Sequence, residues 1–197
     1  MPSNRLSLFL LAFGSLLLLV LGCFTETFNP SLMYLRDRLA AGEYWRLITA
    51  HLVHLGVVHT LLNLAGLGLV LALFARAWST LQWLLAFIVG TLFTSLCLYY
   101  FSPGIYYYAG LSGVLHGLLI FGLWPGLWQR DPLAWLMALA VIAKLGYEQW
   151  MPDSHVSTEA LIGAPVVTIA HVYGAFGGGI TAMVMWSGRK FWRSRLA

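Results

Sequence analysis

Long apolar runs separated by short polar segments dominate the hydropathy pattern of this chain. A helix that crosses a bilayer needs roughly 20 predominantly apolar residues, and six segments approach that length. They lie at about 6–24, 50–74, 80–102, 112–129, 132–150 and 163–186. The pattern predicts an all-α, polytopic membrane protein, a six-helix bundle that forms a single domain over residues 1–197.

Composition supports a membrane protein. The chain is 60% hydrophobic and 9% charged, whereas soluble domains contain about 25% charged residues. The net charge of +4 does not indicate a nucleic-acid partner, because the basic residues lie at the ends of the apolar segments. Cys23 and Cys97 both fall inside apolar runs, so we expect buried free thiols rather than a disulfide.

The first apolar run has two interpretations. Arg5 precedes it, as a basic residue precedes the core of a signal peptide. The stretch "VLGC" faintly resembles a lipoprotein cleavage site, but Leu21 fits such a site poorly. We expect this segment to be a helix of the protein.

Basic residues predict the orientation in the membrane. In a six-span arrangement, one side carries Arg5, Arg76, Arg130, Arg189, Lys190, Arg193 and Arg195. Arg36, Arg38, Arg46 and six of the seven acidic residues lie on or near the other side. We therefore expect both termini to be cytoplasmic, since an odd number of spans would put the basic tail outside. In the loop 25–49, Tyr44 and Trp45 suit a membrane interface.

Several polar residues interrupt the predicted spans, where burial in hydrocarbon is costly. They are His51, His54, His59, Asn63, Ser112, His116, Lys144, Glu148 and His171. His59 and Asn63 share one helical face because they are four residues apart, and Ser112 and His116 do the same. We expect four of these residues to converge in the outer half of the bilayer: His59, Asn63, Ser112 and His171.

Small residues predict which helices meet. Ala170, Gly174, Gly178 and Ala182 form a ridge at intervals of four, and Gly113 and Gly117 lie beside Ser112. Such ridges let helix backbones approach closely. The segments 112–129 and 163–186 are therefore expected to pack tightly enough for Ser112 and His171 to touch.

Ser112 and His171 are suited to nucleophilic catalysis. A serine hydroxyl becomes a good nucleophile when a base such as His171 removes its proton. The N–H groups at the start of the helix that begins near Ser112, together with His59 and Asn63, suit a developing oxyanion. Each residue also has a structural interpretation: Ser112 can bond its own backbone, and His171 can serve packing.

The remaining polar residues favour structural roles. His51 and His54 are expected to be structural, and Lys144 and Glu148, four residues apart, most simply form an ion pair. Neither the last span nor its surroundings supplies an obvious aspartate as a partner for His171. The histidines lack the acidic or thiol neighbours typical of metal sites, so we expect neither a metal nor a cofactor.

Taken together, four motifs resemble those of the rhomboid family of intramembrane serine proteases. They are "WR" at Trp45-Arg46, "HTLLN" at 59–63, "GLSG" at 110–113 and "AHVYGAFGG" at 170–178. They occur in the family's order and cover most of the chain, from about 43 to 186. Any one of them alone is a weak signal.

The resemblance implies a site residue by residue. It implies a Ser112 nucleophile and a His171 general base, acting as a dyad without a third acid. His59, Asn63 and the Ser112 backbone N–H would form the oxyanion hole. Gly110 would leave room for the substrate strand, and Gly174 and Gly178 would support the helix contact. His116 stands where many members have a tyrosine that supports the histidine ring.

The short chain, "SGVLHG" at 112–117 and the Lys144 and Glu148 pair look most like the rhombosortase branch. That branch implies substrates with a C-terminal Gly-Gly motif, a single membrane span and a basic tail. Cleavage near the motif would then be followed by hydrolysis or by transfer to a lipid amine. The resemblance also implies a Gram-negative inner membrane, with the active site open to the periplasm.

The family implies a substrate path between the segments 50–74 and 132–150, with the loop 151–162 as a cap. Lys144 and Glu148 are then candidates for a gate or a substrate contact. Two other functions are considered. An inactive rhomboid-like protein would bind transmembrane segments without cleavage, but the presence of Ser112 and His171 argues against it. A small transporter is disfavoured because no repeat symmetry is visible.

Overall fold

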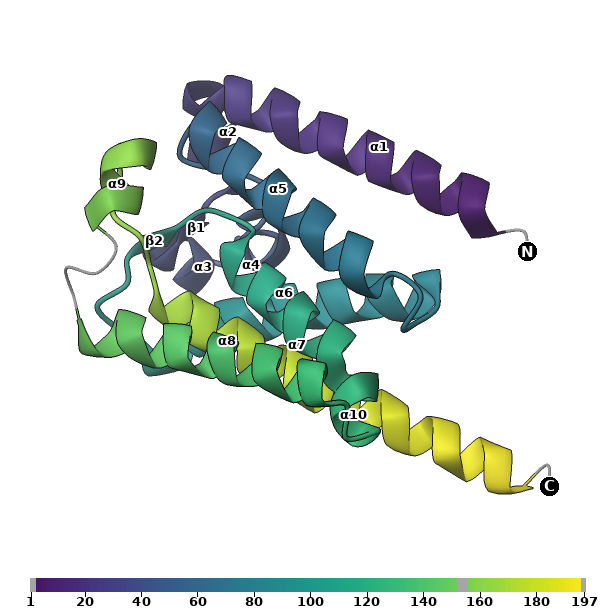
Figure 1. Ribbon diagram of the computed structural model, residues 1–197. Helices are drawn as coiled ribbons and strands as arrows, with labels where there is room; N and C mark the ends of the chain where they lie inside the picture. Colours follow the sequence, from purple (N-terminus) through teal and green to yellow (C-terminus); the bar gives the residue numbers. More distant parts are fainter. Residues whose placement is uncertain (1–2, 152–155, 196–197) are drawn as a thin grey trace.

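The fold is a bundle of long helices with short elements gathered at one end (Figure 1). A computed structural model describes residues 3–151 and 156–195 of the chain. The long helices are α1 (Ser3–Cys23), α5 (Val57–Phe74), α6 (Thr80–Phe101), α7 (Ser112–Trp128), α8 (Pro132–Trp150) and α10 (Ile169–Arg195). Each corresponds to one of the six predicted segments.

Two of the predicted helix starts are wrong. Residues 50–56 form a turn instead of the first two turns of α5, and Gly56, with φ of 126°, ends that turn. His51 and His54 therefore lie outside the helix. At the other boundary, Gly163 has φ of 73° and Pro165 follows it, so α10 begins at Ile169 and not at 163. His171 consequently lies in the first turn of its helix.

Short elements that the apolar pattern did not predict form the connections. They are α2 (Thr25–Leu32), β1 (Tyr34–Leu35), α3 (Arg36–Ala40), α4 (Arg46–Thr49), β2 (Tyr107–Tyr108) and α9 (Val156–Ile162). The strands β1 and β2 pair antiparallel, with Tyr34 opposite Tyr108. The fold is therefore mostly helical rather than purely so. Of the predicted cap 151–162, residues 152–155 lie outside the described residues.

A buried arginine organises the segment 25–49. The Arg46 side chain is almost inaccessible and forms an ion pair of 2.6 Å with Glu43. Its guanidinium also donates to the carbonyls of Met33 at 2.7 Å and Pro30 at 2.9 Å. These bonds tie α2, β1 and α4 together. The neighbouring Trp45 is exposed, as an interfacial side chain would be.

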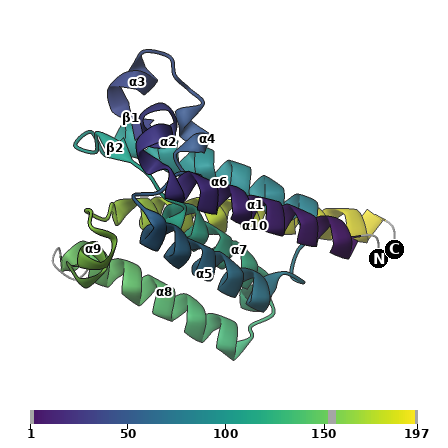
Figure 2. The ribbon, with the colours of Figure 1, turned by 90° about the horizontal axis from the view of Figure 1, so that it is seen from above.

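Three described helices are long and apolar enough to cross a bilayer: Val57–Phe74, Thr80–Phe101 and Ile169–Gly188. A fourth span is added if Ala12–Cys23 and Thr25–Leu32, bent by 104°, are taken as one. The chain is thus an integral membrane protein by these helices, and the count of six spans stays a prediction. The start of α1 and the end of α10 lie at the same end of the bundle (Figure 2).

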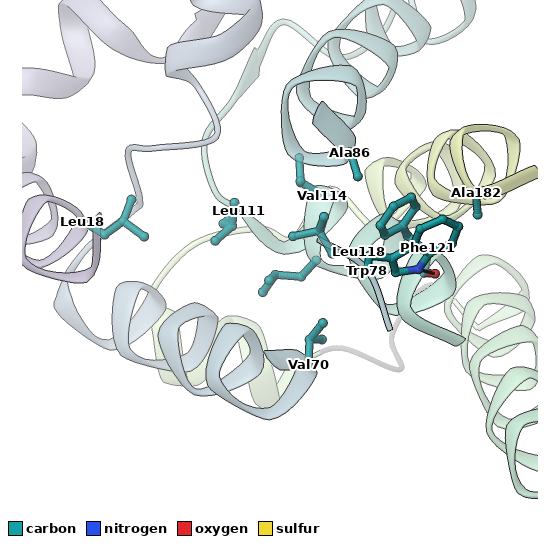
Figure 3. Packing of buried hydrophobic residues seen from close by; sticks show 10 residues of the cluster. Leu18, Val70, Trp78, Ala86, Leu111, Val114, Leu118, Phe121 and Ala182 are labelled. Atoms are coloured by element: carbon teal, nitrogen blue, oxygen red, sulfur yellow. Dashed lines mark hydrogen bonds between the residues drawn. The ribbon is translucent and has the colours of Figure 1, made fainter. Parts of the chain in front are cut away.

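The main apolar core lies around α7. Val114, Leu118 and Phe121 of α7 meet residues of α1, α5, α6 and α10, as Figure 3 shows. The Trp78 ring stacks on Phe121 at 4.4 Å, and its indole N–H donates to the Phe121 carbonyl at 2.7 Å. The turn before α6 is thereby fixed to the middle of the bundle.

The α7–α10 contact is a backbone-to-backbone one, as the glycine pattern predicts. A Cβ on Gly117 would lie 2.5 Å from the carbonyl oxygen of Gly174, and one on Gly113 would lie 2.9 Å from that of Ala170. A Cβ on Gly174 or Gly178 would overlap the carbonyl oxygen of Gly113 or Gly117, respectively. Only glycine fits at these positions. This close approach places the first turns of α7 and α10 side by side.

Both cysteines are free, as predicted. Cys97 is buried in α6, but Cys23 is exposed at the end of α1, so the prediction of burial is wrong for Cys23.

Candidate active site

Ser112 is the first residue of α7, at the end of the bundle that carries the short elements. The backbone reverses just before it at Gly110, whose φ of 131° favours glycine. A Cβ at that position would lie 2.8 Å from the His59 ring. As the first residue of a helix, Ser112 has a backbone N–H that finds no acceptor within the helix and is available to a ligand. Gly110 thus brings the serine, an amide donor and His59 together.

The hydroxyl of Ser112 meets the ring of His171. Their Oγ and Nε2 atoms are 3.0 Å apart, a normal hydrogen-bond distance. The residues are 59 positions apart in the sequence and come from α7 and α10. The predicted contact between the two spans is therefore present. His171 is buried, so the pair is largely shielded from bulk solvent.

The other ring nitrogen of His171 has an acidic partner, which sequence reasoning missed. The Nδ1 atom lies 3.0 Å from Oε2 of Glu148, on α8. The expectation that His171 lacks a third group is thus wrong. The acid comes from α8 and not from the neighbourhood of the last span in the sequence. A carboxylate inside an apolar helix was the available signal.

Lys144 and Glu148 do form the predicted ion pair, at 2.7 Å between Nζ and Oε1. The pair is also connected to the site on both sides. Lys144 donates to Nε2 of His116 at 3.0 Å, while the second carboxylate oxygen of Glu148 contacts His171. The ion pair therefore lies beside the serine and histidine, and its role as a gate or a substrate contact stays a prediction.

His116 supports the His171 ring by stacking. Their ring centroids are 4.4 Å apart with planes inclined by 20°. The Nδ1 atom of His116 lies 2.8 Å from the carbonyl oxygen of Ser112. Because a carbonyl only accepts, His116 carries its proton on Nδ1, and its Nε2 is free to accept from Lys144. An imidazole thus occupies the position beside the His171 ring.

His59 and Asn63 line the same cavity as Ser112 and His171. The His59 Nδ1 accepts the N–H of Leu55 at 3.3 Å, which turns its other nitrogen toward Gly110. One amide N–H of Asn63 donates to the His59 carbonyl at 3.0 Å. An amide has a second N–H, so the predicted role in an oxyanion hole is stereochemically open to both residues.

The cavity beside Ser112 has a volume of about 460 Å³. It lies between α5, α7 and α8, with Thr158 and Ile162 of α9 on its border. Apolar side chains, chiefly leucine and valine, form most of its walls, and polar residues that include Ser112, His171, His59 and Asn63 also line it. Such a space suits an apolar segment whose backbone reaches the serine.

His51 and His54 hold the surroundings of the site, as expected for structural residues. His51 Nε2 lies 2.9 Å from the Ser95 hydroxyl and 3.1 Å from the Thr91 carbonyl, both on α6. His54 Nε2 accepts the N–H of Leu111 at 3.4 Å, directly before the serine. These contacts fix the turn 50–56 against α6 and the start of α7.

Tyr108 also fixes the approach to Ser112. Its hydroxyl donates to the Gly110 carbonyl at 2.6 Å. Burial raises the pKa of the Tyr108 phenol, so it stays a neutral donor. This bond orients the Gly110 peptide and hence the turn that leads into α7.

Comparison with known proteins assigns a family to this arrangement. The Rhomboid domain model matches residues 41–188. The chain is 26% identical over 140 residues to "Putative rhomboid protease YdcA" of Bacillus subtilis (strain 168), covering 71% of this chain and 66% of that protein. It is 33% identical over 81 residues to "Rhomboid protease GluP" of the same organism, covering 41% of this chain and 16% of that protein. The chain thus spans less than two thirds of each of these relatives.

Proposed function

The chain belongs to the rhomboid family, and on that premise we propose that it is an intramembrane serine protease. Ser112 is the nucleophile and His171 the general base. The single observation that carries the proposal is the 3.0 Å contact between Ser112 Oγ and His171 Nε2. It joins two residues from different helices that both line a largely apolar cavity, and the hydrogen bond is the one that a nucleophile and its base require.

The first half of the reaction forms an acyl-enzyme. The Ser112 oxygen attacks the carbonyl carbon of the scissile peptide while its proton passes to Nε2 of His171. The tetrahedral intermediate then collapses: the C–N bond breaks, and the leaving amine takes the proton from His171. The acyl group remains on Ser112 as an ester.

The second half releases the acyl group. A water molecule gives its proton to His171 as its oxygen attacks the ester, and the Ser112 oxygen recovers that proton as it leaves. A lipid amine in place of water would give an amide-linked product by the same steps. Because water and a lipid amine would attack the same ester with the same two residues, hydrolysis and transfer differ only in the product that is released.

His59, Asn63 and the Ser112 backbone N–H stabilise the oxyanion of the intermediate in this proposal. The positions of these groups support this role. His59 and Asn63 line the same cavity as Ser112, and the Ser112 N–H lies at the start of α7. Each donor of this kind contributes roughly 3–4 kcal/mol to the transition state.

The substrate approaches between α5 and α8. The cavity that contains Ser112 lies between these helices, and α9 borders it. α9 packs against α5 at the end of the bundle where α7 begins (Figure 1). A transmembrane segment that unwinds near this end can place an extended peptide at the serine while its apolar part stays in contact with lipid.

The preferred substrate class is a single-span protein with a C-terminal Gly-Gly motif and a basic tail. The features that suggest this rhombosortase specificity are His116, Lys144 and Glu148, and all three lie around His171. We propose further that the protein lies in a bacterial inner membrane, with the site open to the periplasm. The site lies at the end of the bundle opposite to the start of α1 and the end of α10, which supports this orientation (Figure 2).

The test is cleavage of a synthetic single-span substrate, with a Gly-Gly motif and basic tail, by the full chain in proteoliposomes. Ser112→Ala and His171→Ala are expected to abolish cleavage while remaining folded. Ser187→Ala is the matched control, because that hydroxyl donates to the carbonyl of Met183 on its own helix, at 2.9 Å. Cleavage by Ser112→Ala would refute the nucleophile, and binding without cleavage by the parent would favour an inactive capture protein.

A further inference from the structure

The two nitrogens of the His171 ring have different partners. Nε2 contacts the Ser112 hydroxyl, and Nδ1 contacts Oε2 of Glu148, each at 3.0 Å. The side chains of His171 and Glu148 are only 6% and 13% exposed. A carboxylate at this position accepts a hydrogen bond and cannot donate one when ionised.

This contact fixes the tautomer of the ring. Because Glu148 accepts, the ring proton of neutral His171 lies on Nδ1, and the lone pair lies on Nε2, toward Ser112. In the opposite tautomer Nε2–H would face the serine and could not take its proton. Once the base has taken that proton, the negative charge of Glu148 stabilises the imidazolium.

We propose that Glu148 is a positioning residue of the active site, so that the base is the His171–Glu148 pair and the site is a Ser–His–Glu triad. The inference rests on the proposed serine mechanism. Glu148 touches neither substrate nor the serine oxygen. It acts through His171, by holding the ring in the productive tautomer and orientation.

Lys144 and His116 hold Glu148 in place. The two carboxylate oxygens are divided between Lys144, at 2.7 Å, and His171, at 3.0 Å, so the carboxylate has one orientation that satisfies both. Lys144 is in turn bonded to His116, whose ring stacks on His171. The side chains of His171, Glu148, Lys144 and His116 form a closed ring of contacts, and Ser112 joins it at Nε2 of His171.

A purely structural ion pair is the competing explanation, and it makes a different prediction. If Lys144 and Glu148 only stabilise α8, removing either partner breaks the same ion pair and lowers the unfolding free energy without a selective loss of kcat. If Glu148 positions His171, removing Glu148 is far more damaging to catalysis than removing Lys144. The asymmetry between the two variants is therefore the decisive quantity.

The experiment measures kcat and KM of the full chain in proteoliposomes with the synthetic Gly-Gly substrate. Glu148→Gln is expected to lower kcat by on the order of 100-fold or more, with KM changed less than about threefold. Lys144→Met is expected to lower kcat by less than about tenfold, because His171 keeps its carboxylate. Glu148→Asp, which keeps the charge, is expected to recover part of the loss.

Asp131→Asn is the matched carboxylate control. Asp131 caps the far end of α8 by accepting the N–H of Leu133 at 3.0 Å, and asparagine caps as well. This variant is expected to retain the parent kcat. If Glu148→Gln does not fold, the Lys144→Met/Glu148→Gln double variant tests the missing carboxylate without leaving an unpaired charge, and its kcat is expected to be equally low.

Equal losses of kcat in Lys144→Met and Glu148→Gln would overturn the inference. So would a folded Glu148→Gln or Lys144→Met/Glu148→Gln variant that keeps more than about a third of the parent kcat. Such a result leaves the proposed function intact if Ser112→Ala is inactive in the same assay. An active Ser112→Ala would instead refute the serine mechanism itself. The two failures are thus distinguishable.

Discussion

The contact of α7 with α10 sets the distance between nucleophile and base, and Gly117→Ala tests this directly. The new Cβ would lie 2.5 Å from the Gly174 carbonyl oxygen, whereas ordinary contact begins at 3.4 Å. The two backbones must therefore separate by about 0.9 Å. Gly117 is five residues from Ser112, or roughly 7.5 Å along the helix, so the separation reaches the active site.

Both stability and activity are expected to fall. Overpacking of this kind costs typically 1–3 kcal/mol of unfolding free energy. A separation near 1 Å would also lengthen the 3.0 Å contact between Ser112 and His171. Since misplacement by 1 Å can cost on the order of 100-fold in rate, kcat is expected to fall by roughly 10- to 100-fold.

The assay combines kcat in proteoliposomes with denaturant unfolding in detergent. Gly68→Ala is the matched control: Gly68 is also helical, but a Cβ there would meet no atom within 4 Å. It is expected to keep full activity and to be as stable as the parent or slightly more so. If Gly117→Ala matched the parent in both measurements, close backbone packing would not be what positions the site.

Three further predictions concern other contacts. Asn63→Ala is expected to lower kcat by on the order of 100-fold with little change in KM; unchanged kcat would remove Asn63 from the oxyanion hole. Arg46→Met leaves Glu43 and two carbonyls without their buried donor, so unfolding free energy is expected to fall by about 3–5 kcal/mol. A melting temperature equal to that of the parent would contradict this. Trp78→Phe keeps the stack on Phe121 but loses the 2.7 Å hydrogen bond, which is expected to cost about 1–3 kcal/mol in denaturant unfolding; no loss would show that this bond contributes nothing.

Apolar periodicity was sufficient to predict the long helices, because each long apolar run forms one helix. It did not predict where α5 and α10 begin. The residues directly before each of these helices are apolar enough to belong to it. Gly56 and Gly163 adopt positive φ there, however, and interrupt the helical conformation. The short strands β1 and β2 were also missed, since two-residue strands leave no periodic signal.

The Ser112–His171 contact was predictable because the glycine ridges reveal which helices approach closely. The partner of His171 was not, because the small residues Ala134 and Ala138 lie near the start of α8, at the other end of that helix from Glu148. Lys144 and Glu148 could be paired from their spacing. Only the fold shows that both point toward His171 and His116.

The most direct test of the central claim is labelling of the parent protein by a fluorophosphonate, which reacts with an activated serine and needs no substrate. Mass spectrometry of the labelled chain is expected to place the phosphonyl group on Ser112, and His171→Ala is expected to slow labelling by on the order of 1,000-fold. Absence of label from Ser112, or labelling at the parent rate in folded His171→Ala, would contradict proton transfer from the serine to this histidine.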